Sequence, residues 1–196
     1  MASGGWNERS LAAWIPLEPG ERVAVAGSCP PLEGALRHAG AAVRRCRSTV
    51  ELADGARHAV DHLIVPDLDN VPDLLDGGVI RHAVRPGGTV LVGAEHRRWR
   101  PTPRSTAHST RSLQAALAGC GVGHIDVFAV RQSLSNPRAI VAVDARVLRW
   151  YVATSFLPLS RPESILASGL QLMRPGRVAL ALFPALMALG EISGEP

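Results

Sequence analysis

The chain has 196 residues, of which 21 are basic and 17 acidic, giving a formal net charge of +4. This length suits one domain with a sizeable core and a terminal extension. Every basic residue is arginine, a bias that a GC-rich coding sequence explains, so the net charge alone does not indicate a nucleic-acid partner, and that role ranks last.

The cysteines and the hydropathy pattern bear on the compartment. Cys29, Cys46 and Cys120 are odd in number and widely spaced, which argues against a disulfide framework or a CxxC zinc site and predicts a reduced cytoplasmic chain. The histidines lack metal-ligand spacing. The polar, Gly-rich opening Met1–Ser10 does not resemble a secretory signal, and the longest apolar run, Val178–Leu189, is too short to cross a bilayer.

Short β-branched runs alternate with helical stretches over the first 145 residues. Such alternation is typical of a right-handed, mostly parallel, doubly wound sheet with helices on its faces. We expect helices at 10–15, 32–39, 49–59, 71–84 with a break at 77–78, and 110–118. We expect strands at 22–26, 41–45, 61–66 and 89–92, and an antiparallel hairpin of 124–133 with 139–143 around Asn136-Pro137.

The segment from 79 to 93 is the most informative part of the chain. Its apolar residues at 79, 80, 83 and 84 share one helical face. The tight turn Arg85-Pro86-Gly87-Gly88 then ends the helix. Thr89–Val92 follows as a β-branched run without exposed alternation, which predicts a buried parallel strand.

Placed after an earlier strand that ends at Gly27, this turn resembles the late strand region of class I S-adenosylmethionine-dependent methyltransferases, in which an RPGG turn is common. The expected terminal hairpin is also how the sheets of that family finish. The resemblance covers residues 12–145. It implies a Rossmann-like methyltransferase sheet over residues 1–148 and S-adenosylmethionine as the cofactor.

The family brings an acid and three alternating glycines to the end of its first strand, because the chain passes close to the methionine part of the cofactor. The equivalent run, Val25–Pro31, keeps only the first glycine, Gly27, and two prolines remove backbone donors. The cofactor motif is therefore degenerate. The positions that the resemblance implies for cofactor binding are Gly27, Ser28, Cys29 and Asp67.

An acid normally ends the second strand of the family and accepts both ribose hydroxyls. Here that neighbourhood is Arg44-Arg45-Cys46-Arg47, and the nearest acid, Glu51, is expected inside the following helix. The third strand and its helix are expected to be missing, because about fifteen residues separate the second strand from Asp61. Arginine here would also suit the 2′-phosphate of NADP, but the required Gly-x-Gly-x-x-Gly turn does not occur.

A cluster of arginines with one tryptophan follows the strand at 89–92. Guanidinium groups favour phosphate or carboxylate partners, and the indole could stack on a ring or peptide, so an anionic small molecule, a peptide or a solvated loop all fit. His96 and His108 flank this loop as candidate general bases, although no residue is assigned a catalytic role. The cluster consists of Arg97, Arg98, Trp99, Arg100 and Arg104.

Residues 149–196 are expected to form a C-terminal helical extension. Ser160 and Glu163 have capping-box spacing, which predicts one helix, and Val178–Leu189 predicts a second. These apolar faces must be covered by the same domain, by a second copy of the chain or by a protein partner.

Two functions are open at this point. The first is a methyltransferase-like protein with a degenerate cofactor site, acting as a non-catalytic or repurposed binding or scaffold subunit of a bacterial biosynthetic pathway. The alternative is an active S-adenosylmethionine-dependent methyltransferase of secondary metabolism that acts on a small molecule or a modified peptide. Binding of the cofactor discriminates between them.

Overall fold

The computed structural model describes residues 8–55, 57–75, 78–95, 109–131, 139–155 and 183–194. Within these residues, seven strands form one mixed sheet in the order β2-β1-β3-β4-β7-β5-β6. The strands are β1 (Arg22–Ala26), β2 (Ala42–Cys46), β3 (Val60–Val65), β4 (Val84–Glu95), β5 (Val122–Arg131), β6 (Ala139–Ala142) and β7 (Ala185–Ile192). The first four strands are parallel, β7 is antiparallel to β4 and β5, and β6 is antiparallel to β5. The predicted mostly parallel sheet with a late antiparallel hairpin is confirmed.

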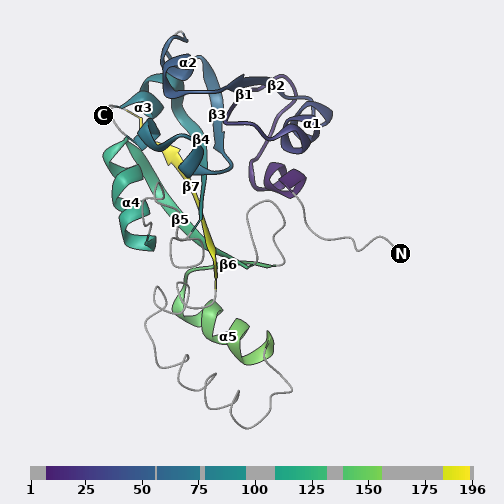
Figure 1. Ribbon diagram of the computed structural model, residues 1–196, viewed down its shortest axis with the longest axis vertical. Coiled ribbons are helices and arrows are strands. Elements are labelled where there is room, and N and C mark those ends of the chain that lie inside the picture. Colours follow the sequence, from purple (N-terminus) through teal and green to yellow (C-terminus); the bar gives the residue numbers. More distant parts are fainter. Residues whose placement is uncertain are drawn as a thin grey trace.

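Helices cover both faces of this sheet, as the doubly wound prediction requires (Figure 1). The 3-10 helix η1 (Glu8–Trp14) and α1 (Pro30–His38) pack on one face through leucines and Ile15. On the other face lie α2 (Thr49–Ala53), the 3-10 helix η3 (Pro72–Leu75), α3 (Val79–Ala83) and α4 (Thr110–Gly119). A short 3-10 helix, η2 (Leu68–Asn70), follows β3. None of the helices in the described ranges is long and apolar enough to cross a membrane.

The last described helix, α5 (Ala145–Ser155), lies beside β6 (Figure 1). Its Leu148 packs with Phe183 and with apolar residues of β5 and β6 in a small separate cluster. Trp150 and Val147, by contrast, are 65% and 38% exposed. One side of α5 is therefore buried against the sheet, and the other presents apolar surface.

β2 forms one edge of the sheet. From β2 the chain passes through α2 to β3, which pairs with the opposite side of β1. No strand lies outside β2 in the described part of the chain.

The RPGG segment is a wide bulge inside β4 rather than a turn before a strand. Val84 pairs with Val60, and the next pair is Thr89 with His62, so the four residues 85–88 of β4 lie opposite the single residue Asp61 of β3. Gly87 has φ +74°, and a Cβ at Gly88 would collide with the carbonyl oxygen of Asp61. The bulge therefore needs glycine at both positions, for two different reasons.

The predicted helix over Val178–Leu189 is wrong from residue 185 onward. β7 lies in the middle of the sheet between β4 and β5, and nearly all of its residues are buried. A strand that is covered on both faces shows no alternation of polar and apolar residues, so its pattern cannot be told from that of a buried helix. Residues 185–192 therefore belong to the α/β sheet and not to a separate extension of 149–196.

Some helices are shorter than predicted. The helix expected over 49–59 ends at Ala53, whereas that expected over 71–84 with a break at 77–78 is, as predicted, divided in two, into η3 and α3. The first helix, expected over 10–15, is a 3-10 helix. The helix predicted around Ser160 lies outside the described residues.

Candidate functional site

The structure places the four predicted cofactor positions along one edge of the sheet. Gly27, Ser28 and Cys29 follow the carboxyl end of β1, and Asp67 follows that of β3. β1 and β3 are parallel neighbours, so their carboxyl ends lie side by side. This is the edge at which open α/β sheets bind ligands. We call these four residues, together with Cys46 at the end of β2, the cofactor edge.

The loop after β1 offers few backbone donors. Gly27 has φ +94°, and its N–H donates to the carbonyl of Cys46 on β2 at 2.8 Å. The N-cap of α1 is Cys29, which is 2% exposed and caps through no side-chain hydrogen bond. The first two helical positions are Pro30 and Pro31, which have no N–H. The start of α1 is thus a poor anion site, since the N–H groups that normally hold a carboxylate are missing.

The end of β2 carries no acid that could face a ribose. Cys46 is fully buried, and burial raises the pKa of its thiol. The carboxylate of Glu51 accepts the backbone N–H of Arg47 at 2.6 Å, while the hydroxyl of Ser48 accepts the N–H of Glu51 at 3.2 Å. Ser48 therefore caps the start of α2, and the Glu51 carboxylate holds the backbone just before that cap. As predicted, Glu51 lies inside the helix, and its carboxylate serves the helix start.

Asp67 supports a local turn. Its carboxylate accepts a hydrogen bond from the side-chain amide of Asn70 at 3.0 Å, and its carbonyl accepts the Asn70 N–H at 3.3 Å. These bonds close the 3-10 turn η2. The side chain of Asp67 is half-buried at the cofactor edge. Asp67 therefore stabilises the turn and also places a carboxylate after the carboxyl end of β3.

A second cluster of charges, which the sequence did not predict, lies at the amino ends of the parallel strands, opposite the cofactor edge. The Asp61 carboxylate accepts from Arg22 Nε at 3.3 Å and Arg85 Nε at 2.9 Å. Arg85 also reaches Glu21 at 3.2 Å, and the other Glu21 oxygen lies 2.9 Å from Nε2 of the buried His62. The N–H of Glu18 and the His62 contact lower the pKa of Glu21, while burial acts against them. The bulge in β4 is what brings Arg85 here, so this cluster ties β1, β3 and β4 together.

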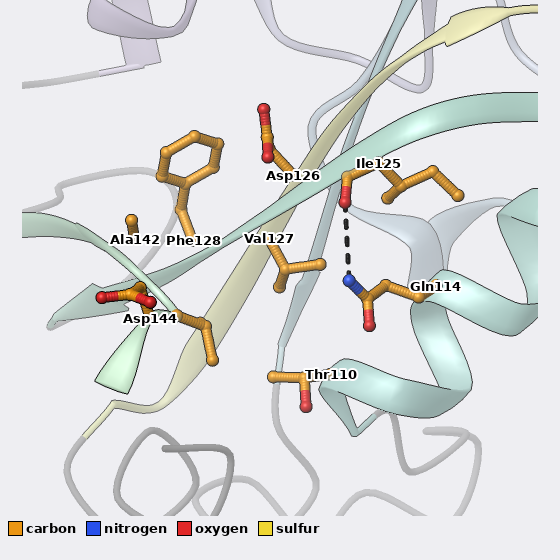
Figure 2. A pocket seen from close by; sticks show the side chains of 9 residues that line it. Thr110, Gln114, Ile125, Asp126, Val127, Phe128, Ala142 and Asp144 are labelled. Atoms are coloured by element: carbon orange, nitrogen blue, oxygen red, sulfur yellow. Dashed lines mark hydrogen bonds between the residues drawn. The ribbon is translucent and has the colours of Figure 1, made fainter. Parts of the chain in front are cut away.

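A cavity of about 480 Å³ lies between α4, β5 and the end of β6 (Figure 2). Val127 projects toward Gln114, whose amide donates to the carbonyl of Ile125 at 3.4 Å, whereas Asp126 and Phe128 project to the other side of β5 (Figure 2). The strand bulges just before these residues. Of the predicted site residues that the structure describes, none lines this cavity, and the lining residues come from segments that share no sequence motif. The lining residues are Thr110, Gln114, Ile125, Asp126, Val127, Phe128, Ala142, Val143 and Asp144.

The remaining predicted positions are those of the arginine cluster and the two histidines that flank it. Arg97, Arg98, Trp99, Arg100 and Arg104, with His96 and His108, lie outside the described residues. No group of three or more His, Cys, Asp or Glu side chains that could hold a metal ion occurs in the described ranges.

Comparison with known proteins connects this geometry to a fold. Neither a protein-family model nor a curated protein matches the chain. Solved structures do match: phosphoethanolamine N-methyltransferase 2 of Haemonchus contortus, in complex with S-adenosylhomocysteine, is 13% identical with a TM-score of 0.59. That match covers 97% of this chain and 54% of the enzyme, so the chain spans about half of the enzyme's length.

Two further structures match over most of their own length. An S-adenosylmethionine-dependent methyltransferase of Archaeoglobus fulgidus is 10% identical with a TM-score of 0.58, and the match covers 94% of this chain and 92% of that one. A Haloferax volcanii methyltransferase, solved with the Trm112 methyltransferase activator, is 14% identical with a TM-score of 0.50, covering 97% and 90%. At such identities the likeness concerns architecture and not the reaction. The mixed sheet, its flanking helices and these neighbours together show that the chain has the fold of the class I S-adenosylmethionine-dependent methyltransferases.

Proposed function

We propose that this chain is a methyltransferase-like protein whose cofactor edge is degenerate and which acts as a non-catalytic or repurposed binding or scaffold subunit of a bacterial biosynthetic pathway. The observation that carries the proposal is the end of β2. There the thiol of Cys46 is buried, and the carboxylate nearest in sequence, that of Glu51, accepts the backbone N–H of Arg47 just before α2.

The expected loss of affinity is large. A hydrogen bond from a ribose hydroxyl to a carboxylate is worth about 1.5–3 kcal/mol. Lack of the hydrogen bonds from both ribose hydroxyls therefore weakens cofactor binding by roughly two to four orders of magnitude. The two prolines at the start of α1 add to this loss, because they remove donors for the cofactor's carboxylate.

A protein partner also suits this fold. The similar Haloferax volcanii methyltransferase was solved with an activator protein. In this chain, α5 exposes Trp150 and Val147, so we place the partner contact, or a contact between two copies of the chain, in the C-terminal region. Replacement of Trp150 by Glu should abolish co-purification or self-association, whereas Arg111→Glu on the exposed side of α4 should not.

The second candidate is an active S-adenosylmethionine-dependent methyltransferase that acts on a small molecule or a modified peptide. It is favoured by Gly27, which keeps a positive φ at the end of β1, and by the cofactor product bound in the similar Haemonchus contortus enzyme. In that case Gly27, Ser28, Cys29 and Asp67 would contact the cofactor, and the arginines at 97–104 would hold an anionic acceptor. Cys29, Cys46 and Cys120 form no disulfide in the described part of the chain, and in either case we expect a reducing, cytoplasmic compartment.

Calorimetric titration with S-adenosylmethionine and S-adenosylhomocysteine separates the two functions. The scaffold proposal predicts no saturable heat with either ligand, in protein whose cooperative urea unfolding shows that it is folded. Micromolar binding that Gly27→Val removes would instead support the enzyme. Valine is strained at the φ of +94° that Gly27 adopts, so this variant changes the backbone of the cofactor edge. Its Cβ meets no atom within 4 Å, so it creates no steric clash elsewhere.

A further inference from the structure

The outer edge of β2 is open, and two hydrogen bonds show which backbone groups lie on it. The N–H of Ala42 donates to the carbonyl of Glu21 at 2.8 Å, and the carbonyl of Cys46 accepts the N–H of Gly27 at 2.8 Å. Both partners belong to the β1 side of the strand. The backbone groups of Ala42 and Cys46 therefore point toward β1.

Successive residues of a strand point their N–H and C=O groups to opposite sides. Arg44, two residues from each of these anchors, consequently faces β1 as well. Val43 and Arg45 face outward, and within the described residues no strand pairs with them. The edge thus offers two donors and two acceptors, the pattern that a further strand would bind.

This open stretch has defined ends. On one side the N–H of Ala41 donates to the carbonyl of Leu36 on α1 at 3.0 Å. On the other side the N–H of Arg47 is taken by the Glu51 carboxylate at 2.6 Å. The groups between them can accommodate one short extended segment, since the neighbouring outward N–H at each end is already bonded.

The edge is also strongly basic on both faces. Arg45 turns to the α1 side, where its Nε lies 2.6 Å from Glu33 Oε1. Arg44 turns to the α2 side, where its guanidinium donates to the backbone carbonyl of Glu51 at 2.6 Å and not to a carboxylate. Arg47 follows directly. Four arginines, these three and Arg37, thus surround the edge, with Glu33 and Glu51 as the acids next to them.

We propose that the outer edge of β2 docks an extended acidic segment of a partner protein, which adds a strand to the sheet through the backbone of Val43 and Arg45. Backbone hydrogen bonds would supply the pairing, and the arginines on both faces would select acidic side chains. A second copy of β2 is disfavoured as the occupant, because it would bring arginine against arginine across the pair. The proposal rests on the binding role given above and gives it a second contact surface besides that of α5.

Amide hydrogen exchange of the ¹⁵N-labelled full chain tests the pairing residue by residue. The probe is a capped hexapeptide of alternating Glu and Val. We expect the amides of Val43 and Arg45 to exchange more slowly when the peptide is bound, while that of Arg44 is already protected in the free protein. A peptide of alternating Lys and Val is the charge control, and the acidic peptide with N-methylated backbone is the control for strand pairing.

Variants distinguish the backbone from the charges. Val43→Pro removes one outward N–H, whereas Val43→Ala keeps it, so the comparison isolates that donor; proline is tolerated at such edge positions. We expect Val43→Pro to bind the acidic peptide about fivefold more weakly than Val43→Ala, the effect of one hydrogen bond. Arg44→Glu should weaken binding as well, while Arg111→Glu on α4 should bind as the unmodified protein does.

Three outcomes would overturn the proposal. The acidic peptide could fail to bind, in which case the arginines merely protect the edge. The N-methylated peptide could bind equally well, which would mean attraction by charge without a strand. The protein could self-associate through Val43 and Arg45 in sedimentation, which would make a second copy the occupant. None of these results depends on the titration with S-adenosylmethionine, so a failure here is distinct from a failure of the proposed function.

Discussion

Replacement of Arg45 by methionine should destabilise the protein, because the buried carboxylate of Glu33 would keep only one of its two arginine partners. The Glu33 side chain is 4% exposed, with Arg45 at 2.6 Å from one oxygen and Arg37 at 3.5 Å from the other. The hydrogen bond from Arg45 lowers the pKa of Glu33, and burial opposes it. Methionine keeps the apolar stem of the side chain and removes the charged group.

The expected cost follows from this geometry. Removal of one partner from a buried ion pair typically costs 3–5 kcal/mol. Arg37 remains close to Glu33, so we expect about 2–3 kcal/mol at pH 7. Because the folded pKa of Glu33 is depressed, its stabilising contribution is present above its unfolded value of 4.5 and is lost as the pH falls through the folded value. The difference between the variant and the unmodified protein should therefore shrink in acid.

Urea unfolding measured across this pH range is the assay. The double variant Arg45→Met with Glu33→Gln should recover much of the loss, because the buried charge has gone. Arg44→Met is the matched control on the same strand and should stay within about 0.5 kcal/mol, since its side chain is exposed. Equal losses for Arg44→Met and Arg45→Met, or a loss that does not depend on pH, would refute the reasoning.

Three further predictions concern the rest of the sheet. Gly88→Ala should lower the free energy of unfolding in urea by about 3 kcal/mol, because the new Cβ meets backbone carbonyl oxygens. Gly87→Ala should lower it by only about 1 kcal/mol, because alanine is strained at the positive φ of this residue. Equal costs would contradict the bulge geometry. Burial raises the pKa of Asp61, but the stronger combined effect of the Arg22 hydrogen bonds holds it below its usual value. Asp61→Asn should therefore destabilise at neutral pH and cost progressively less below about pH 4; a constant cost would argue against the ion pair. The Cys46 thiol, left alone after the other two cysteines are replaced by serine, should resist iodoacetamide until urea is added; rapid labelling of folded protein would show that it is accessible.

The sequence was sufficient for elements whose signals are local. The strand at 22–26 and the helix from Thr110 have the predicted bounds within a residue, because each is delimited by glycines or a capping serine. The hairpin of β5 and β6 was found from its turn signal for the same reason. The missing acid at the end of β2 could also be read directly, since it depends on residue identity alone.

Other parts depend on contacts between distant segments. The sequence of β7 predicts a helix because a strand buried on both faces has no periodic signature. Only pairing with its two neighbours, β4 and β5, makes it a strand. The ion cluster joins Glu21, Asp61 and Arg85, which are separated by tens of residues, through a bulge that the RPGG motif did not reveal. No local rule could have assembled either feature.

Amide NMR signals of the cofactor edge show whether that edge binds S-adenosylmethionine. S-adenosylhomocysteine would be added to the ¹⁵N-labelled chain while the signals of Gly27, Ser28 and Asp67 are followed. We expect that these signals do not shift, even at millimolar ligand, in a spectrum with the dispersion of a folded protein. A saturable shift of Gly27 together with Asp67 would contradict this expectation and would establish a working cofactor site at the ends of β1 and β3.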